Sequence, residues 1–318
     1  MKTSSITYRL TVLWALNESV LGGFLHAVQV PFTGIMVGGI AVAIICLIGL
    51  HNERPFAAIW KATLSVLVVK LLISPYTPFP AYVAVLFQCF VGSFFFLLFG
   101  YRRWAVMLFS VLAMVESAIQ KVLVLTLIFG KELWTSINQF SDSVLKQFGL
   151  HVSSYSQILI VAYVAVYFLW GVILGLFVFK LPAAIAKKED IIQTILSVGN
   201  SKISPAEMKK TRQNFFKKII LFLIVLSLVF YFTHSAMLML KSILVIVSIY
   251  FIIPLLLQKI IQLLKIKNNT TQLIQDMTAL KTDAVLVWQY THTHYKNLKA
   301  FYQFILLLFA ISIYAKNE

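Results

Sequence analysis

Long apolar stretches alternate with short polar or basic segments along most of this chain. A helix needs roughly 20 mostly apolar residues to cross the hydrocarbon core of a bilayer. Nine stretches reach or approach that length, so the pattern predicts nine transmembrane helices. We place them at residues 10–29, 34–50, 57–73, 81–99, 104–129, 155–179, 219–233, 242–258 and 300–315.

Proline and glycine residues mark the connections between these stretches. Pro31 and Gly34 separate the first two predicted helices, and Pro55 suits the first turn of the third. A cluster of prolines predicts a stiff, non-helical bend between the third and fourth helices: Pro75, Pro78 and Pro80.

The composition agrees with a membrane protein. The chain of 318 residues is 60% hydrophobic and only 12% charged, whereas a soluble domain has about a quarter of its residues charged. The fold class that we expect is therefore an all-α integral membrane protein, with a six-helix N-terminal bundle and a C-terminal three-span extension.

The net charge of +16 is explained by the bilayer and needs no nucleic acid, because the basic residues lie at the ends of the apolar segments. With a cytoplasmic N-terminus, most of the 27 Lys and Arg residues fall on the cytoplasmic side. The outer side keeps Lys131, Lys146, Lys241 and Lys316. We therefore expect a multi-pass protein of the bacterial cytoplasmic (inner) membrane with its N-terminus in the cytoplasm.

Three regions follow from this topology. Residues 1–180 form a six-span membrane bundle with short loops, and residues 181–218 form a cytoplasmic, basic, helical linker. Residues 219–318 form a C-terminal membrane region that includes a cytoplasmic helical segment at 259–299.

The first predicted helix has one face of small residues. At about 100° per residue, a ridge is formed by Ala15, Ser19, Gly23 and Ala27. Two explanations fit this ridge: close packing within the bundle, or a docking surface for another membrane subunit. Bulky residues fill the opposite half of the helix, where Asn17 is the one misfit.

Ionisable and polar side chains also occur inside the predicted spans. An acid in a bilayer costs a few kcal/mol unless it faces the bundle interior or a cavity, and so it is a functional hypothesis. Glu18 could instead have a structural partner, Lys70 or Lys121. Two explanations fit these polar side chains: an internal network in which the charges neutralise one another, or a polar cavity for a solute. The candidate substrate-binding residues are Glu18, His26, Gln29, Lys70, Glu116, Gln120 and Lys121.

Sequence motifs of soluble enzymes are missing. The chain has no phosphate-binding glycine-rich loop, no HExxH pair, no cysteine pair with metal spacing and no G-x-S-x-G elbow. We therefore expect no enzymatic activity, no cofactor and no metal site. Without a nucleotide motif, active transport would need a separate partner to supply energy.

Residues 1–180 resemble the substrate-binding (S) component of energy-coupling factor (ECF) vitamin transporters. The resemblance rests on the six spans, the small residues in ALNES (15–19), the break at VPFTG (30–34) and the stretch SPYTPFPAYVAVLFQCFVG (74–92). It implies a small polar ligand (a vitamin, its precursor or a metal), a transmembrane coupling subunit docked at Ala15 and Ser19, and cytoplasmic ATPases.

The C-terminal region departs from that family, because a lone S component lacks it. It would fit a reduced coupling module fused in line, but it has no Ala-Arg-Gly signature. We therefore carry two functional hypotheses. The first is a subunit of an uptake transporter that binds a polar solute in the six-span bundle. The alternative is a membrane scaffold or assembly factor whose basic cytoplasmic segments bind partners or anionic lipid.

Overall fold

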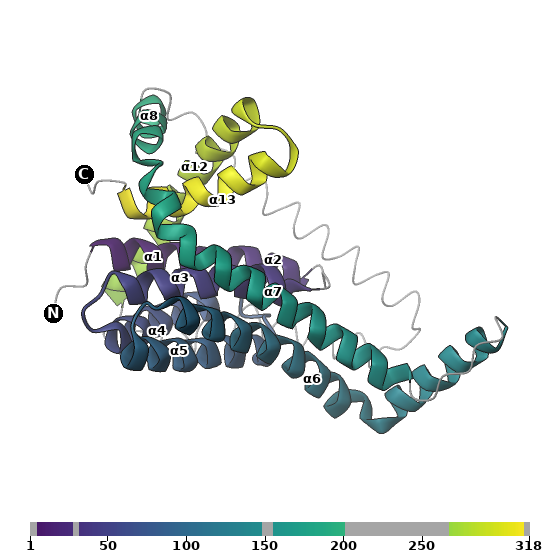
Figure 1. The fold of residues 1–318 in the computed structure, drawn as a ribbon. Coiled ribbons are helices and arrows are strands. Elements are labelled where there is room, and N and C mark those ends of the chain that lie inside the picture. The colour runs from purple at the N-terminus through teal and green to yellow at the C-terminus, as the bar shows by residue number, and fades with distance from the viewer. Residues whose placement is uncertain (1–4, 28–31, 148–154, 201–266, 315–318) are drawn as a thin grey trace, which may run out of the picture.

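The computed structural model describes residues 5–27, 32–147, 155–200 and 267–314 (Figure 1). Every regular element in these four ranges is a helix, so the all-α fold class is confirmed for this part of the chain. The predicted spans at 219–233 and 242–258 lie outside the described residues, as do Gln29 and Lys241.

The first two helices each contain a turn of π-helix. The first is continuous from Ser5 to Ala27 and consists of α1 (Ser5–Leu16), the π-turn η1 (Asn17–Leu21) and α2 (Gly22–Ala27). The second consists of the π-turn η2 (Gly34–Gly38) and α3 (Gly39–Leu50). A π-turn inserts an extra residue, so side chains beyond it no longer follow the phase of a regular α-helix.

Among the described residues, five helices are long and apolar enough to cross a membrane, which supports a multi-pass membrane protein. They are α4 (Pro55–Ile73), α5 (Phe79–Phe99), α6 (Arg103–Lys146), α7 (Tyr155–Ala186) and α13 (Asn297–Tyr314). Gly34–Leu50 is a shorter apolar helix. Two further helices are α8 (Glu189–Asn200) and α12 (Lys267–His294).

Two helices extend past their predicted ends. Beyond residue 129, α6 continues to Lys146 through a kink at Gly130, whose φ of 69° and ψ of −166° suit only glycine without strain. Likewise, α7 runs through Pro182 to Ala186. A proline near the end of a helix costs little backbone hydrogen bonding. Because α7 ends at Ala186, the predicted domain boundary at residue 180 falls inside this helix.

The centre of the bundle is α3. Nine of its residues are buried, at positions 39 and 41–48, and it packs against α1, α4, α5, α6 and α7. A helix that is apolar on all sides is stable only where other helices surround it. Its short length is consistent with this position, because its neighbours separate it from lipid.

The bundle has two different ends. The apolar end contains the first part of α1 and the last part of α3, where the buried side chains include Leu10, Trp14, Ile44, Ile48 and Phe109. The polar end contains η1, η2, the last turn of α4 and the first part of α5. Its buried side chains include Asn17, Glu18, Lys70 and Gln88.

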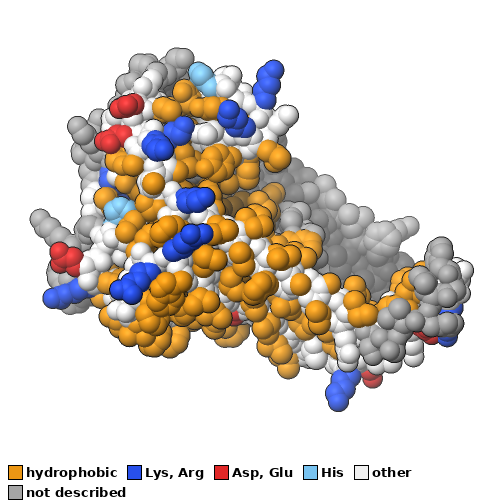
Figure 2. Space-filling model, in the orientation of Figure 1, with side chains coloured by type: hydrophobic (Ala, Val, Ile, Leu, Met, Phe, Trp, Pro, Cys, Tyr) orange, Lys and Arg blue, Asp and Glu red, His pale blue; other side chains and the backbone are white. Residues whose placement is uncertain are grey.

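The outward sides of the long helices are apolar. Exposed residues on them include Leu64, Phe90, Leu97, Leu123 and Val161. Figure 2 shows hydrophobic side chains over most of the surface of the bundle. Large apolar surfaces of this kind are expected of helices that contact lipid.

The C-terminal hairpin of α12 and α13 packs on the bundle, and α13 contacts both α1 and α7. The Arg9 guanidinium donates a hydrogen bond of 2.8 Å to the carbonyl oxygen of Ile313, and the Tyr8 hydroxyl donates one to Asp276. The last turn of α13 therefore lies beside the start of α1. Counting nine spans from a cytoplasmic N-terminus would put these two helix ends on opposite sides, so the span count and this contact do not agree.

Candidate functional site

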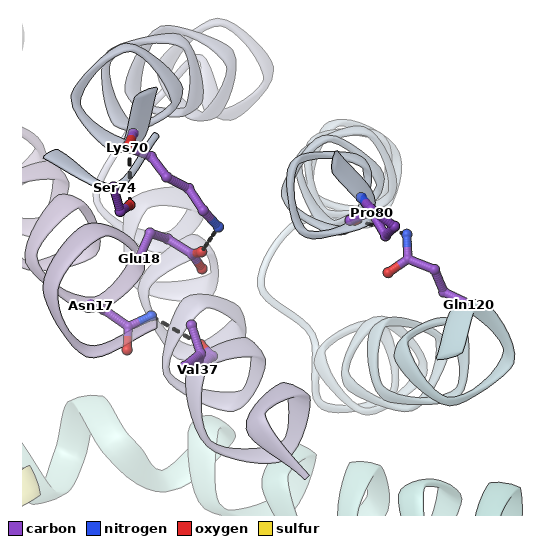
Figure 3. Close-up of polar contacts among 7 residues, drawn as sticks. All are labelled: Asn17, Glu18, Val37, Lys70, Ser74, Pro80 and Gln120. Atoms are coloured by element: carbon purple, nitrogen blue, oxygen red, sulfur yellow. Dashed lines mark hydrogen bonds and ion pairs between the residues drawn. The ribbon is translucent and has the colours of Figure 1, made fainter. Parts of the chain in front are cut away.

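Two π-turns meet at the polar end of the bundle. Asn17 in η1 donates a hydrogen bond of 2.9 Å from its side-chain nitrogen to the backbone carbonyl of Val37 in η2 (Figure 3). The helices approach closely here, because a Cβ added to Gly22 would lie 3.3 Å from the Val37 side chain. Irregular turns inside otherwise regular helices occur frequently at functional sites.

A buried ion pair joins η1 to α4. The Lys70 ammonium lies 2.6 Å from the Glu18 carboxylate, and the two side chains are only 1% and 4% exposed. Figure 3 shows Lys70 reaching from α4 toward Glu18. The ammonium also lies 5.3 Å from the centre of the Tyr82 ring. A buried pair repays its desolvation only when its geometry is good and its remaining polar atoms find partners.

The ion pair settles one of the open alternatives for Glu18. Its structural partner is Lys70, and the pair is neutral as a unit. Lys121 is exposed on α6, so the structure does not bring it into the same interior. The predicted association of Glu18 with a lysine is therefore confirmed for Lys70.

The remaining predicted residues have different surroundings. Gln120 donates a hydrogen bond of 2.9 Å from its side-chain amide to the carbonyl of Pro80, which joins α6 to the start of α5 (Figure 3). Glu116 lies one turn earlier on α6, where its Oε2 atom is buried without a hydrogen-bond partner. His26 is half-buried in α2. Glu116 and Gln120 thus share one side of α6, whereas the ion pair belongs to α1 and α4.

The small-residue ridge faces the interior of the chain. Ala15 and Ser19 are buried, and a Cβ added to Gly23 would lie 2.9 Å from the Cβ of Ser74. These three residues are therefore covered by the chain itself, which is the close-packing arrangement. A second subunit could reach them only if α4 and the 74–76 segment moved away. Ala27 is the last residue of α2.

Several buried polar atoms at this end have no hydrogen-bond partner within the described part of the chain. They are Asn17 Oδ1, Ser19 Oγ, Thr77 Oγ1, Tyr82 Oη, Gln88 Oε1 and Glu116 Oε2. Buried polar groups are nearly always hydrogen-bonded in folded proteins, so each exception needs a reason. We call these six residues, together with Glu18 and Lys70, the polar cluster.

Contacts around Gly38 connect the parts of the polar cluster. A Cβ added to Gly38 would lie 3.2 Å from Gln88 Nε2 and 3.9 Å from Ser117 Oγ. Ser117 is the neighbour of Glu116, and Gly38 follows Val37, which Asn17 contacts. Polar side chains therefore run from the ion pair, past η2, to Gln88 on α5 and Ser117 on α6.

Asn17, Thr77, Tyr82 and Gln88 were not among the residues predicted from the sequence. On a regular helical wheel Asn17 falls among bulky side chains, but α1 is buried on all sides at residues 10–15, and Asn17 is itself only 4% exposed. Tyr82 and Gln88 lie in an apolar stretch, in which a single Gln is itself a usable signal. The buried Gln could thus have been found from the sequence.

Basic residues gather away from the polar cluster. Figure 2 shows Lys and Arg side chains in a band over one end of the molecule. Four exposed basic residues lie where the start of α6 meets the end of α7, a junction that the hydrogen bond from Tyr101 to Val178 marks: Arg102, Arg103, Lys180 and Lys187. An exposed basic band at one end of a bundle is typical of a cytoplasmic membrane face.

No protein-family model matches the chain, and no curated protein and no solved structure matches it. The resemblance of residues 1–180 to S components therefore stays a prediction, and the polar cluster is the structural feature that bears on function.

Proposed function

We propose that this chain is a membrane-embedded subunit of an uptake transporter that binds a small polar solute at the polar cluster. The observation that carries the proposal is the set of unpartnered, buried polar atoms beside the Glu18–Lys70 pair. Polar and ionisable groups at membrane depth are costly, and they commonly mark the path or the binding site of a solute. A solute that makes hydrogen bonds to these atoms would lower that cost.

The proposed setting is a bacterial inner membrane, with nine spans and a cytoplasmic N-terminus. The positive-inside distribution of Lys and Arg supports this orientation. The energy source is proposed to be a transmembrane coupling subunit with cytoplasmic ATPases, as the resemblance to S components implies. Because Gly23 of the small-residue ridge packs against Ser74 and Tyr76, which follow α4, docking there would require this segment to move away from the first helix.

Binding can be tested with the purified, full-length chain in detergent micelles. We expect at least one member of a panel of vitamins, vitamin precursors and metal ions to raise the melting temperature or to co-purify. A stabilising shift follows whenever a solute binds the folded state and not the unfolded one. A panel without any shift, from a protein that carries no small molecule, would contradict the proposal.

Gln88→Leu makes this test specific to the cluster. The change removes a buried acceptor that has no partner, so the variant should be as stable as the parent or more stable without solute. It should also lose most of the shift that the solute causes. Gln139→Leu, at an exposed position on α6, is the matched control and should keep that shift. Equal shifts in both variants would place the solute elsewhere.

The scaffold alternative is favoured by the exposed basic band. It predicts that reversing the charge of Arg102, Arg103, Lys180 and Lys187 abolishes the phenotype-rescuing activity of the gene in a deletion strain. It also predicts that Glu18→Ala and Glu116→Ala, if they fold, rescue normally. The transporter proposal predicts the opposite pattern.

A further inference from the structure

Half of the six unpartnered atoms of the polar cluster can only accept hydrogen bonds, and none of the six can only donate them. Asn17 Oδ1, Gln88 Oε1 and an ionised Glu116 Oε2 can only accept, whereas the hydroxyls of Ser19, Thr77 and Tyr82 can do both. Among the described residues, the buried unpartnered N–H groups belong to Arg9, Trp14 and Trp60, which precede the cluster in α1 and α4. A solute that satisfies this cluster must therefore supply donors.

The charges of the polar cluster also favour a solute that carries hydrogen-bond donors. Lys70 is already neutralised by Glu18 at 2.6 Å. Neither of the ion pairs found in the described part of the chain includes Glu116, and Lys121 on the same helix is exposed. Once Glu116 is ionised, it is a partly buried carboxylate without an ion-pair partner among the described residues, and a cation beside it would lower its cost at membrane depth.

The acceptors are spread over several helices. Asn17 lies on the first helix, Gln88 on α5 and Glu116 on α6, one turn before Gln120. Figure 3 shows the Glu18–Lys70 pair and Gln120 on two different sides of the bundle. A metal ion such as Ca²⁺ needs each of its oxygen ligands to lie within about 2.6 Å of the ion, so the ligands must surround one point. A molecule with several N–H groups can instead reach acceptors that lie apart.

We propose that the solute is an organic cation that carries a primary amine or a similar N–H-rich group, with Glu116 as its counter-charge and Gln88 and Asn17 as acceptors. This inference rests on the proposed solute-binding function and narrows its substrate class. It excludes carboxylate-bearing solutes as the preferred ligands, because a second anion beside Glu116 would be repelled.

Matched probes of different charge test the inference on the purified, full-length chain. Benzylamine and 1,4-diaminobutane should raise the melting temperature in a concentration-dependent way. Benzyl alcohol, 1,4-butanediol, benzoate and succinate should raise it much less. Small molecules released from the purified protein and identified by mass spectrometry should likewise carry an amine. If neither amine shifts the melting temperature and no amine co-purifies, the inference is overturned.

Glu116→Gln supplies the second arm, because it keeps the shape of the side chain and removes its charge. We expect at least a tenfold loss of apparent affinity for the amines. Glu132→Gln makes the same change at an exposed position on α6 and should bind normally. Unchanged affinity in Glu116→Gln would overturn the inference. Size-exclusion chromatography of both variants verifies that they are folded.

The two proposals fail in different ways. If neutral or anionic solutes bind and the amines do not, solute binding stands and the amine inference is wrong. If sodium ions stabilise the protein and displace the amines in a Glu116-dependent way, the site is a metal-ion site and the amine inference is again wrong. If nothing on the wider panel binds, the proposed function falls as well.

Discussion

The helices pack together through different contacts at the two ends of the bundle. At the apolar end, helices approach so closely that a Cβ added to Gly92 would lie 2.6 Å from the Ile45 side chain, and one added to Gly49 would lie 2.8 Å from Phe96. At the polar end, two helices widen into π-turns, and an ion pair and unpartnered polar atoms occupy the interior.

This difference separates the part of the molecule that stabilises it from the part that is specialised. Buried apolar side chains in regular helices follow every local rule of folding, whereas irregular turns and unpartnered polar groups break several at once. Such violations in natural proteins concentrate at functional sites. We therefore expect the apolar end to stabilise the protein and the polar end to carry the solute-binding function proposed above.

The largest expected effect comes from breaking the buried ion pair. Lys70→Met leaves the Glu18 carboxylate buried without its partner, which should cost about 3–5 kcal/mol of unfolding free energy. Unfolding by a denaturing detergent, followed by circular dichroism, measures the change. The double variant Glu18→Gln/Lys70→Met should recover much of the loss, because no unpaired charge remains.

Lys146→Met is a matched control for this prediction. Lys146 pairs with Asp142 at the same distance of 2.6 Å, but the two side chains are 56% and 40% exposed. Since exposed pairs contribute little to stability, the variant should unfold like the parent. A parent-like stability of Lys70→Met would show that water reaches the polar end and that the pair is not desolvated.

The second prediction concerns the contact between α6 and α7 near the apolar end. A Cβ added to Gly175 would lie 2.8 Å from the Cα of Met107, a backbone atom that cannot move without shifting the helix. Gly175→Ala should therefore destabilise the protein by about 1–3 kcal/mol through overpacking, as measured by thermal unfolding in micelles.

Gly39→Ala provides the comparison for Gly175→Ala. The added Cβ would lie 3.6 Å from the Trp170 side chain, which is an ordinary contact, and alanine favours a helix over glycine. This variant should be unchanged or slightly more stable. If both variants behaved alike, the close approach of α6 and α7 would not contribute to the stability of the bundle.

Much of this fold can be predicted from the lengths of the apolar stretches, because the thickness of the bilayer sets the length of a spanning helix. The positions of α4 and α5 and the start of α6 fall within a few residues of those expected. The partnership of Glu18 with Lys70 was one of two alternatives. The π-turns were not predicted, since no residue type requires them. The helical wheel misplaced Asn17 because the bulky face of the first helix, around Leu13, is buried rather than exposed to lipid.

The C-terminal hairpin was the part least accessible from the sequence. Its position depends on contacts between residues far apart in the chain, such as Arg9 with Ile313 and Phe177 with Tyr302. Counting spans cannot show how α13 packs against α1, and the side of the membrane on which the chain ends is left open by the sequence. Tertiary packing of this kind has no local signature.

The smallest predicted effect tests whether this hairpin strengthens the apolar end. Tyr8→Phe removes the hydrogen bond to Asp276 on α12 and keeps the ring. We expect a loss of about 1 kcal/mol, the usual net worth of such a bond, and faster hydrogen exchange in α12 with little change in α4. Tyr302→Phe keeps its ring contact with Phe177 and serves as the control, with exchange like that of the parent. If Tyr8→Phe left the hydrogen exchange of α12 unchanged, apolar contacts alone would hold the hairpin on the bundle. The hydrogen bond between Tyr8 and Asp276 would then contribute nothing to the stability of the apolar end.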